Sequence, residues 1–272
     1  MRFTILGAGG FIGANLNESL QRQGYEVQAP HRHTEGWLNE DLGNVFYCIG
    51  LTNDYHLRPF DTVEAHVTLL AKLLQRGRFE RLVYLSSTRL YDSSPHTEVD
   101  ETADLLLNSG NARHLYDFSK ALGENLCLTR SAGRASVARL SCVYSDTLHE
   151  GGFLAQLLPK AASGESFSID SSPAYARDYV HVEDVVGLLK NIVLKGEGGI
   201  YNVASGVNTT NAELLNGLQQ YAGVRVTCSH RGELHVPVVS INKAHHEFDY
   251  RPRQLIDRLP VMLEKLRVSD GN

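Results

Sequence analysis

The chain of 272 residues is poor in cysteine, and its few cysteines lie far apart. They are Cys48, Cys127, Cys142 and Cys228. None has a close partner in sequence of the kind that binds zinc or forms a Cys-x-x-Cys redox centre. We therefore expect no metal site, and thiols that stay reduced in a cytoplasmic protein.

An excess of positive charge and long apolar runs are also missing. The formal net charge of -5 at pH 7 argues against a general nucleic-acid binder, which would carry a basic surface. No apolar run approaches the ~18 residues of a membrane-spanning helix, and no signal peptide precedes the first strand-like run. We expect neither nucleic acid nor membrane as a partner. The length allows one broad domain or a main domain with a smaller lobe.

The clearest motif lies in the first thirteen residues. Residues 1–6 are a short apolar run typical of a buried strand, and residues 14–20 are typical of a helix. Between them, Gly7 permits a tight turn, Gly10 allows the backbone to approach a pyrophosphate, and Gly13 allows close helix–strand packing. The helix N-terminus then attracts phosphate. This pattern predicts a dinucleotide site at Gly7, Gly10, Phe11, Ile12 and Gly13; a merely tight turn is the alternative.

Strand-like and helix-like segments alternate along the first 145 residues. The strand-like runs are 1–6, 25–29, 45–50, 81–85 and 135–140, and the longer helical patterns are 60–75 and 115–129. Such alternation predicts an α/β fold of the Rossmann type, with a doubly wound parallel sheet. We expect a dinucleotide-binding domain over 1–145 and mainly a substrate-binding lobe over 146–272. Elements near 180–203 should return to the sheet.

The end of the second predicted strand bears on the choice of cofactor. An acidic residue there favours the ribose 2′-hydroxyl of NAD, whereas an arginine accommodates the 2′-phosphate of NADP. The segment that follows residues 25–29 contains Arg32 and no acidic residue before it. We therefore expect NADP, with NAD as the alternative. If Arg32 is only a solvated surface residue, it indicates nothing about the cofactor.

A tyrosine and a lysine four residues apart provide the candidate acid–base chemistry. Tyr116 and Lys120 lie on a predicted helix, so their side chains share one face. A cation beside a phenol favours phenolate, and we expect it to lower the pKa of Tyr116 towards neutrality. Ser87, at the end of a predicted strand, would give a second hydrogen bond to the same substrate oxygen. By itself the Tyr–Lys spacing also fits a surface pair.

Together these motifs resemble the extended short-chain dehydrogenases/reductases of the NAD-dependent epimerase/dehydratase family, which act on nucleotide sugars. The similarity covers nearly the whole chain. Besides the glycine turn and the Tyr–Lys pair, residues 85–91, 177–185 and 201–206 match family markers.

The resemblance implies roles for particular residues. Ser87, Tyr116 and Lys120 would be catalytic, and Tyr116 and Lys120 would also hold the nicotinamide ribose. Asp41 and Leu42 would lie by the adenine. Thr88, Cys142 and Arg177 would contact the substrate, with Arg177 at a phosphate.

Departures from the family pattern narrow the chemistry. The dehydratases of the family have acidic residues after the position of Ser87, but Thr88 and Arg89 follow here, which argues against dehydration. The family often has asparagine at the positions of His66 and Cys142. The substrates of family members therefore cannot be assigned to this chain. His66 equally fits a histidine buried between helices.

The leading hypothesis is an NAD(P)-dependent 4-keto reductase or 4-epimerase of a nucleotide sugar. A reductase of a non-sugar carbonyl and a non-catalytic dinucleotide-sensing protein are the alternatives. A serine hydrolase fits worse, because no Gly-x-Ser-x-Gly pattern occurs. The family resemblance also implies a homodimer that pairs the helices near 60–75 and 115–129 in a four-helix bundle.

Overall fold

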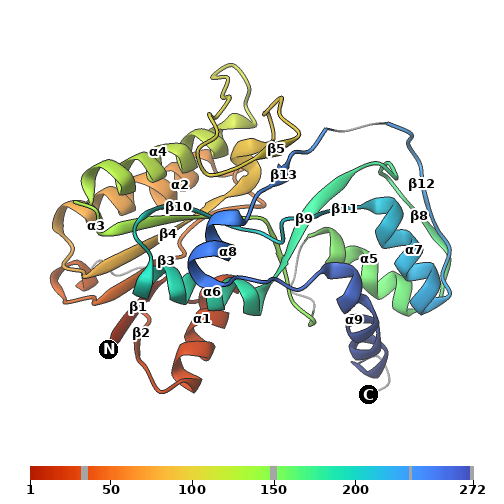
Figure 1. Ribbon diagram of the computed structural model, residues 1–272, viewed down its shortest axis with the longest axis horizontal. Coiled ribbons are helices and arrows are strands. Elements are labelled where there is room, and N and C mark those ends of the chain that lie inside the picture. Colours follow the sequence, from red (N-terminus) through yellow and green to blue (C-terminus); the bar gives the residue numbers. More distant parts are fainter. Residues whose placement is uncertain (32–35, 148–151, 233–234, 270–272) are drawn as a thin grey trace.

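The computed structural model describes residues 1–31, 36–147, 152–232 and 235–269. A six-stranded parallel sheet with the order β2-β1-β3-β4-β6-β10 occupies one half of the molecule (Figure 1). Its strands are β1 (Arg2–Leu6), β2 (Glu26–Gln28), β3 (Asn44–Tyr47), β4 (Arg81–Ser87), β6 (Ala135–Leu140) and β10 (Gly199–Val203). The predicted doubly wound α/β fold is confirmed. As the carboxyl ends of parallel strands share one edge, residues that follow different strands meet there.

Helices cover both faces of this sheet. One face carries α1 (Phe11–Arg22), α6 (Val182–Lys195) and α8 (Asn242–Phe248), and the other carries α2 (Pro59–Val63), η2 (Glu64–Thr68), α3 (Leu69–Arg76) and α4 (His114–Arg130). The first layer buries Leu16 and Leu20 of α1 against Phe3 and Val185. The second buries α3 and α4 against β3 and β4. These apolar layers hold the edge of the sheet rigid for the site.

The helix predicted over 60–75 is not a continuous α-helix. Its middle, η2, has π-helical hydrogen bonding, with α2 before it and α3 after it. Two tyrosine hydroxyls of the underlying strands donate to carbonyl oxygens there, Tyr47 to Ala65 at 2.6 Å and Tyr84 to His66 at 3.2 Å. Carbonyls with such outside donors can leave the regular α-helical ladder, and π segments are frequent at functional sites.

A smaller lobe lies beside the sheet (Figure 1). Its helices are α5 (Phe153–Ala162), α7 (Asn211–Ala222) and α9 (Leu255–Ser269), and its strands are β7 (Cys142–Tyr144), β8 (Phe167–Ile169), β9 (Ala176–His181), β11 (Asn208–Thr210) and β12 (Val226–Cys228). The three helices enclose a separate apolar core that includes Leu158, Leu218 and Leu259. The lobe therefore has its own hydrophobic support.

The remaining short elements lie around the sheet or between it and the lobe. η1 (Gly36–Asn39) precedes β3, η3 (Thr88–Tyr91) follows β4, and β5 (Glu98–Val99) pairs with β13 (Val238–Val239). The buried Asp178 of β9 accepts backbone hydrogen bonds from Ser205 and Gly206, both at 2.8 Å, just beyond the end of β10. This carboxylate fixes the lobe to the carboxyl edge of the sheet. In the described ranges, no helix has both the length and the apolar character needed to cross a membrane.

Candidate active site

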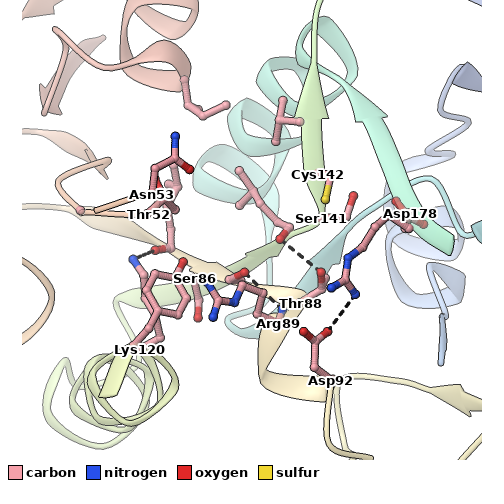
Figure 2. A pocket seen from close by; sticks show the side chains of 18 of the residues that line it. Thr52, Asn53, Ser86, Thr88, Arg89, Asp92, Lys120, Ser141, Cys142 and Asp178 are labelled. Carbon is pink, nitrogen blue, oxygen red and sulfur yellow. Dashed lines mark hydrogen bonds and ion pairs between the residues drawn. The ribbon is translucent and has the colours of Figure 1, made fainter. Parts of the chain in front are cut away.

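A cavity of about 660 Å³ lies at the carboxyl edge of the sheet, where the lobe meets it. It brings together most of the residues predicted from the sequence, namely Gly10, Phe11, Ile12, Gly13, Ser87, Thr88, Tyr116, Lys120, Cys142 and Arg177. Figure 2 shows side chains from β4, η3, α4, β7 and β9 around this space. The glycine turn lines one part of it and the arginines Arg89, Arg113 and Arg177 line another. No group of three or more His, Cys, Asp or Glu side chains in the described ranges is arranged to hold a metal ion.

The glycine turn has a geometry that only glycine tolerates at two positions. Gly7 has a φ of +92°, in the left-handed region. A Cβ on Gly13 would lie 2.3 Å from the carbonyl oxygen of Gly7, so any side chain there would force α1 away from β1. Gly10 is the N-cap of α1 and offers no side-chain cap to the first turn. A bare helix N-terminus that borders a cavity fits the phosphates of a dinucleotide.

Asp41 and Leu42 do not lie at this site. They precede β3, whose register with the parallel β1 pairs Asn44 with Phe3, so both are at the amino ends of the strands. The Arg2 side chain donates to the carbonyl of Asp41, and Leu42 is buried in the core under α3. The glycine turn is at the opposite edge. The role by the adenine that the resemblance implied therefore does not fit these two residues.

The predicted phosphate contact, Arg32, falls outside the described residues. The strand before it, β2, is an edge strand of the sheet and ends at Gln28, which accepts a hydrogen bond from Thr4 at 3.2 Å. The short stretch between β2 and β3 includes only η1 among its described residues.

Ser87 and Tyr116 meet at the end of β4. The Ser87 side chain caps η3 by accepting from the backbone N–H of Arg89 at 3.2 Å. It also hydrogen-bonds with the phenol of Tyr116, which helps to lower the pKa of that phenol. Ser87 is partly exposed to the cavity, whereas Tyr116 is 2% exposed. These two hydroxyls are therefore the pair that a substrate oxygen would meet.

The protonation state of Tyr116 differs from the sequence-based prediction. Burial raises its pKa to about 12, and the hydrogen bond from Ser87 and the charge of Arg89 only partly oppose this. Lys120, the expected cause of a lowered pKa, lies with Nζ 5.9 Å from the centroid of the Tyr116 ring. Its ammonium donates to the carbonyl of Leu85 at 2.8 Å (Figure 2), and burial lowers the pKa of Lys120 to about 7. The prediction was wrong because it ignored desolvation of both groups.

His66 is part of the same cluster. Its Nδ1 lies 2.8 Å from Ser119 Oγ, and its Nε2 accepts from the backbone N–H of Leu51 at 3.1 Å. Burial and the charge of Lys120 lower its pKa to about 2, so the imidazole is neutral. The ring packs edge-on against Tyr116 with centroids 5.4 Å apart. His66 is thus a buried histidine between helices, and it also lines the cavity.

Arg177 is held at the cavity by an acidic partner. Its Nη1 lies 3.5 Å from Asp92, and its guanidinium packs over the Tyr175 ring at 4.9 Å. Arg113 also pairs with Asp92. One carboxylate thus serves two arginines. Three arginines line the cavity, Arg89, Arg113 and Arg177, against the two carboxylates Asp92 and Asp178, so the positive charges outnumber the negative ones, and Cys142 lines it too. Neither Arg113 nor Asp92 could be recognised from the sequence.

A buried polar network supports the site from below. Glu124, one turn after Lys120 on α4, forms a two-pronged ion pair with Arg139 of β6 at 2.9 and 2.7 Å. Ser86 donates to the same carboxylate at 2.5 Å, and Arg139 donates to the hydroxyl of Tyr91 at 2.7 Å. This network joins α4 to β4 and β6, so it fixes Ser87 relative to Tyr116 and Lys120. Its members are too far apart in sequence to be recognised there.

Residues 3–204 match the family described as the NAD dependent epimerase/dehydratase family. A UDP-glucuronic acid decarboxylase 1 from Danio rerio is 24% identical over 245 residues, which are 78% of this chain and 57% of that protein. The chain therefore spans little more than half the length of this relative. A dTDP-4-dehydro-6-deoxy-D-allose reductase from Streptomyces sp is 24% identical over 253 residues, 77% of this chain and 78% of that protein.

Solved structures show the same fold at low sequence identity. The UDP-glucose 4-epimerase of Thermotoga maritima with UDP-glucose has a TM-score of 0.80 and 20% identity, with 99% of each chain covered. RMD from Pseudomonas aeruginosa complexed with NADPH has a TM-score of 0.78 and 21% identity, covering 98% of this chain and 99% of that one.

Proposed function

The chain belongs to the NAD dependent epimerase/dehydratase family, and we propose that it is an NADPH-dependent reductase of a nucleotide-linked keto sugar. The observation that carries this proposal is the position of Tyr116. Its phenol lines the cavity beside Ser87 and, with a pKa raised to about 12, keeps its proton at neutral pH. Reduction of a ketone needs a proton donor in that state.

Tyr116, Ser87 and Lys120 would have different roles in the reduction. A bound nicotinamide dinucleotide would supply hydride to the carbonyl carbon. The Tyr116 hydroxyl would donate its proton to the oxygen that becomes an alkoxide, and Ser87 would hold that oxygen by a hydrogen bond. Lys120 lies behind Tyr116, where its charge stabilises negative charge on the phenol after the proton has left.

The residues after Ser87 favour reduction over dehydration. Thr88 Oγ1 donates to the carbonyl of Leu140 at 3.4 Å, and Arg89 is a permanent cation. Neither can exchange a proton as a carboxylic acid would. The Streptomyces relative is named as a reductase of a dTDP-linked keto sugar, which supports the same reaction class. A 4-epimerase is the alternative, and it would use the same Ser87 and Tyr116.

Gly10, Phe11, Ile12 and Gly13 would hold the dinucleotide phosphates, because they form the helix N-terminus that borders the cavity. Preference for NADPH is part of the proposal and depends on Arg32. The test is a fluorescence titration of the purified protein with NADPH and NADH. We expect tighter binding of NADPH in the wild type and loss of that preference in Arg32→Ala. Equal binding of both dinucleotides would refute the NADP assignment.

Arg177 would bind a substrate phosphate, since its fork is fixed by Asp92 and faces the cavity. The named relatives act on UDP- and dTDP-linked sugars, and a nucleotide diphosphate suits the excess of positive charge in the cavity. Lobe residues of 146–272 would then recognise the substrate and residues 1–145 the dinucleotide.

A homodimer is also proposed. α2 and α4 are in contact and carry exposed apolar side chains, and we call Phe60, Val63, Phe118 and Leu122 the α2/α4 apolar patch. A second copy that covers this patch would form a four-helix bundle. Residence in a reducing cytoplasm is proposed too, and it suits the four free thiols.

The function is tested with the full chain, NADPH, and UDP- and dTDP-linked 4-keto sugars. Consumption of NADPH should depend on the keto sugar. Tyr116→Phe should lower kcat by about 10²-fold or more, because it removes the proton donor, and should weaken NADPH binding much less, because only one of the contacts to the dinucleotide is lost. Tyr221→Phe, on the far end of α7, is the matched control and should behave as wild type. Interconversion of 4-epimers without net NADPH consumption would replace the reductase by the epimerase.

A further inference from the structure

We propose that Arg89 is a specificity residue that binds a carboxylate on the substrate, next to the carbon that is reduced. The substrate class would then be a nucleotide-linked uronic acid or another acidic sugar. This inference rests on the nucleotide-sugar function proposed above. From the sequence alone, Arg89 was notable only because it stands where the dehydratases of the family have an acidic residue.

Arg89 is fixed in the cavity by two aromatic rings. Its guanidinium carbon lies 4.6 Å from the centroid of Tyr116 and 5.0 Å from that of Tyr55, and the two rings are 5.4 Å apart. Nη2 also donates to the hydroxyl of Tyr55 at 3.3 Å. Stacking against aromatic faces holds a planar guanidinium in one orientation, and an arginine held in this way loses little further freedom when it binds a ligand.

The charge of Arg89 is not neutralised by an ion pair. Among the described residues, no carboxylate lies within 4 Å of its guanidinium nitrogens, whereas Arg113 and Arg177 both pair with Asp92. Asp117 attracts Arg89 without forming an ion pair with it. Arg89 is partly buried, and the side-chain hydrogen bond described for it goes to the neutral hydroxyl of Tyr55. Its other N–H groups can therefore donate to an anion. These donors belong to a residue that lines the cavity.

The position of Arg89 decides which anion it can bind. It lies over the ring of Tyr116, so its ligand must be near the atom that Tyr116 protonates. The diphosphate is instead assigned to Arg177 of β9, which pairs with Asp92 at the cavity. An anion beside the reacting carbon of a nucleotide sugar has to be carried by the sugar itself. A carboxylate fits, because a guanidinium binds it through two parallel hydrogen bonds.

The test is calorimetric titration of the NADPH-bound full-length protein with UDP-glucuronic acid and UDP-glucose. The two probes differ only in the group at carbon 6. We expect the wild type to bind UDP-glucuronic acid about tenfold more tightly, the size of one charge-assisted contact. Arg89→Gln should reduce this preference to twofold or less and leave the affinity for UDP-glucose within twofold. Arg89→Lys should keep part of the preference, since it retains the charge but loses the fork.

Two comparisons separate this inference from the proposed function. Arg177→Gln should weaken both probes alike, because it acts on the shared diphosphate. An NADPH titration of each variant checks that it folds. If Arg89→Gln does not fold, Arg89→Lys is used in its place. Equal affinity of the wild type for both probes, or a preference that survives Arg89→Gln, would overturn the role of Arg89 and leave the proposed function standing. Binding of neither probe would overturn both.

Discussion

The ammonium of Lys120 donates to the carbonyl of Leu85 at 2.8 Å and lies 5.9 Å from the centroid of the Tyr116 ring. It is therefore anchored to the end of β4 and not hydrogen-bonded to the phenol. Both groups are almost completely buried. In this arrangement each group resists its charged form, which keeps the phenol protonated and makes the lysine easy to deprotonate.

A pH dependence of stability follows from Lys120. Its pKa is lowered to about 7 in the folded protein, so between this value and its ordinary value the unfolded chain binds more protons. The free energy of unfolding must then rise with pH in this window. From pH 7.5 to pH 9 we expect a gain of about 2 kcal/mol in the wild type relative to Lys120→Met. Urea unfolding of the cofactor-free proteins at several pH values measures it. Lys195→Met, at an exposed position, is the control, and parallel pH profiles for wild type and Lys120→Met would contradict the burial of the charge.

The close approach at the glycine turn predicts a sharp difference between two similar substitutions. Gly13→Ala would place a methyl group 2.3 Å from the carbonyl oxygen of Gly7 and should displace α1, with a loss of at least tenfold in NADPH affinity. Gly9→Ala adds the same atom in open space and should bind NADPH within about threefold of the wild type. A fluorescence titration of both variants compares them. Equal affinities would show that the turn is not where the dinucleotide binds.

The buried ion pair of Glu124 and Arg139 predicts a large stability effect. Their side chains are 4% and 3% exposed. Glu124→Gln would leave the Arg139 charge buried without its partner and should lower the free energy of unfolding by about 3–5 kcal/mol. Glu26→Gln makes the same change in the exposed pair with Arg2 and should cost less than about 1 kcal/mol. Denaturant unfolding of both variants measures the loss of free energy of unfolding for each substitution. Similar losses would mean that water reaches Glu124.

The α2/α4 apolar patch predicts a change of oligomeric state. Phe60 is 88% exposed and Leu122 is 50% exposed in the single chain. If a second copy covers them, light scattering at micromolar concentration should give the mass of two chains for the wild type. Phe60→Glu combined with Leu122→Glu should give the mass of one, because two charges would be buried per subunit. Val268→Glu, at an exposed apolar position on α9, should remain dimeric. A wild-type protein with the mass of one chain would remove the dimer from the proposal.

Much of the architecture could be predicted because its signals are local. The apolar run before Gly7 and the glycine spacing after it predict a strand, a tight turn and a helix, and β1 and α1 lie there. The four-residue spacing of Tyr116 and Lys120 places both on one helical face whatever the rest of the chain does. As parallel strands share their carboxyl edge, the position of Ser87 near that helix also followed from the order of elements.

Other features could not be predicted because they depend on residues that only folding brings together. The break in the helix after Val63 comes from tyrosines of two strands, and the hydrogen bond of His66 is to Ser119, 53 residues further along. The misplacement of Asp41 and Leu42 came from comparing sequence motifs without the strand register that assigns them to the other edge of the sheet.

The sequence by itself thus determined the fold class, the family and the identity of the three residues at the centre of the site. The tertiary structure decided their protonation and their partners. Burial sets the pKa of Tyr116 and of Lys120, and Arg89, at 4.6 Å, is closer to the centroid of the phenol ring than Lys120, at 5.9 Å. The physical reason is that a side-chain charge is stabilised or destabilised by its solvation and by the groups around it, and in a folded chain these come from segments far apart in sequence.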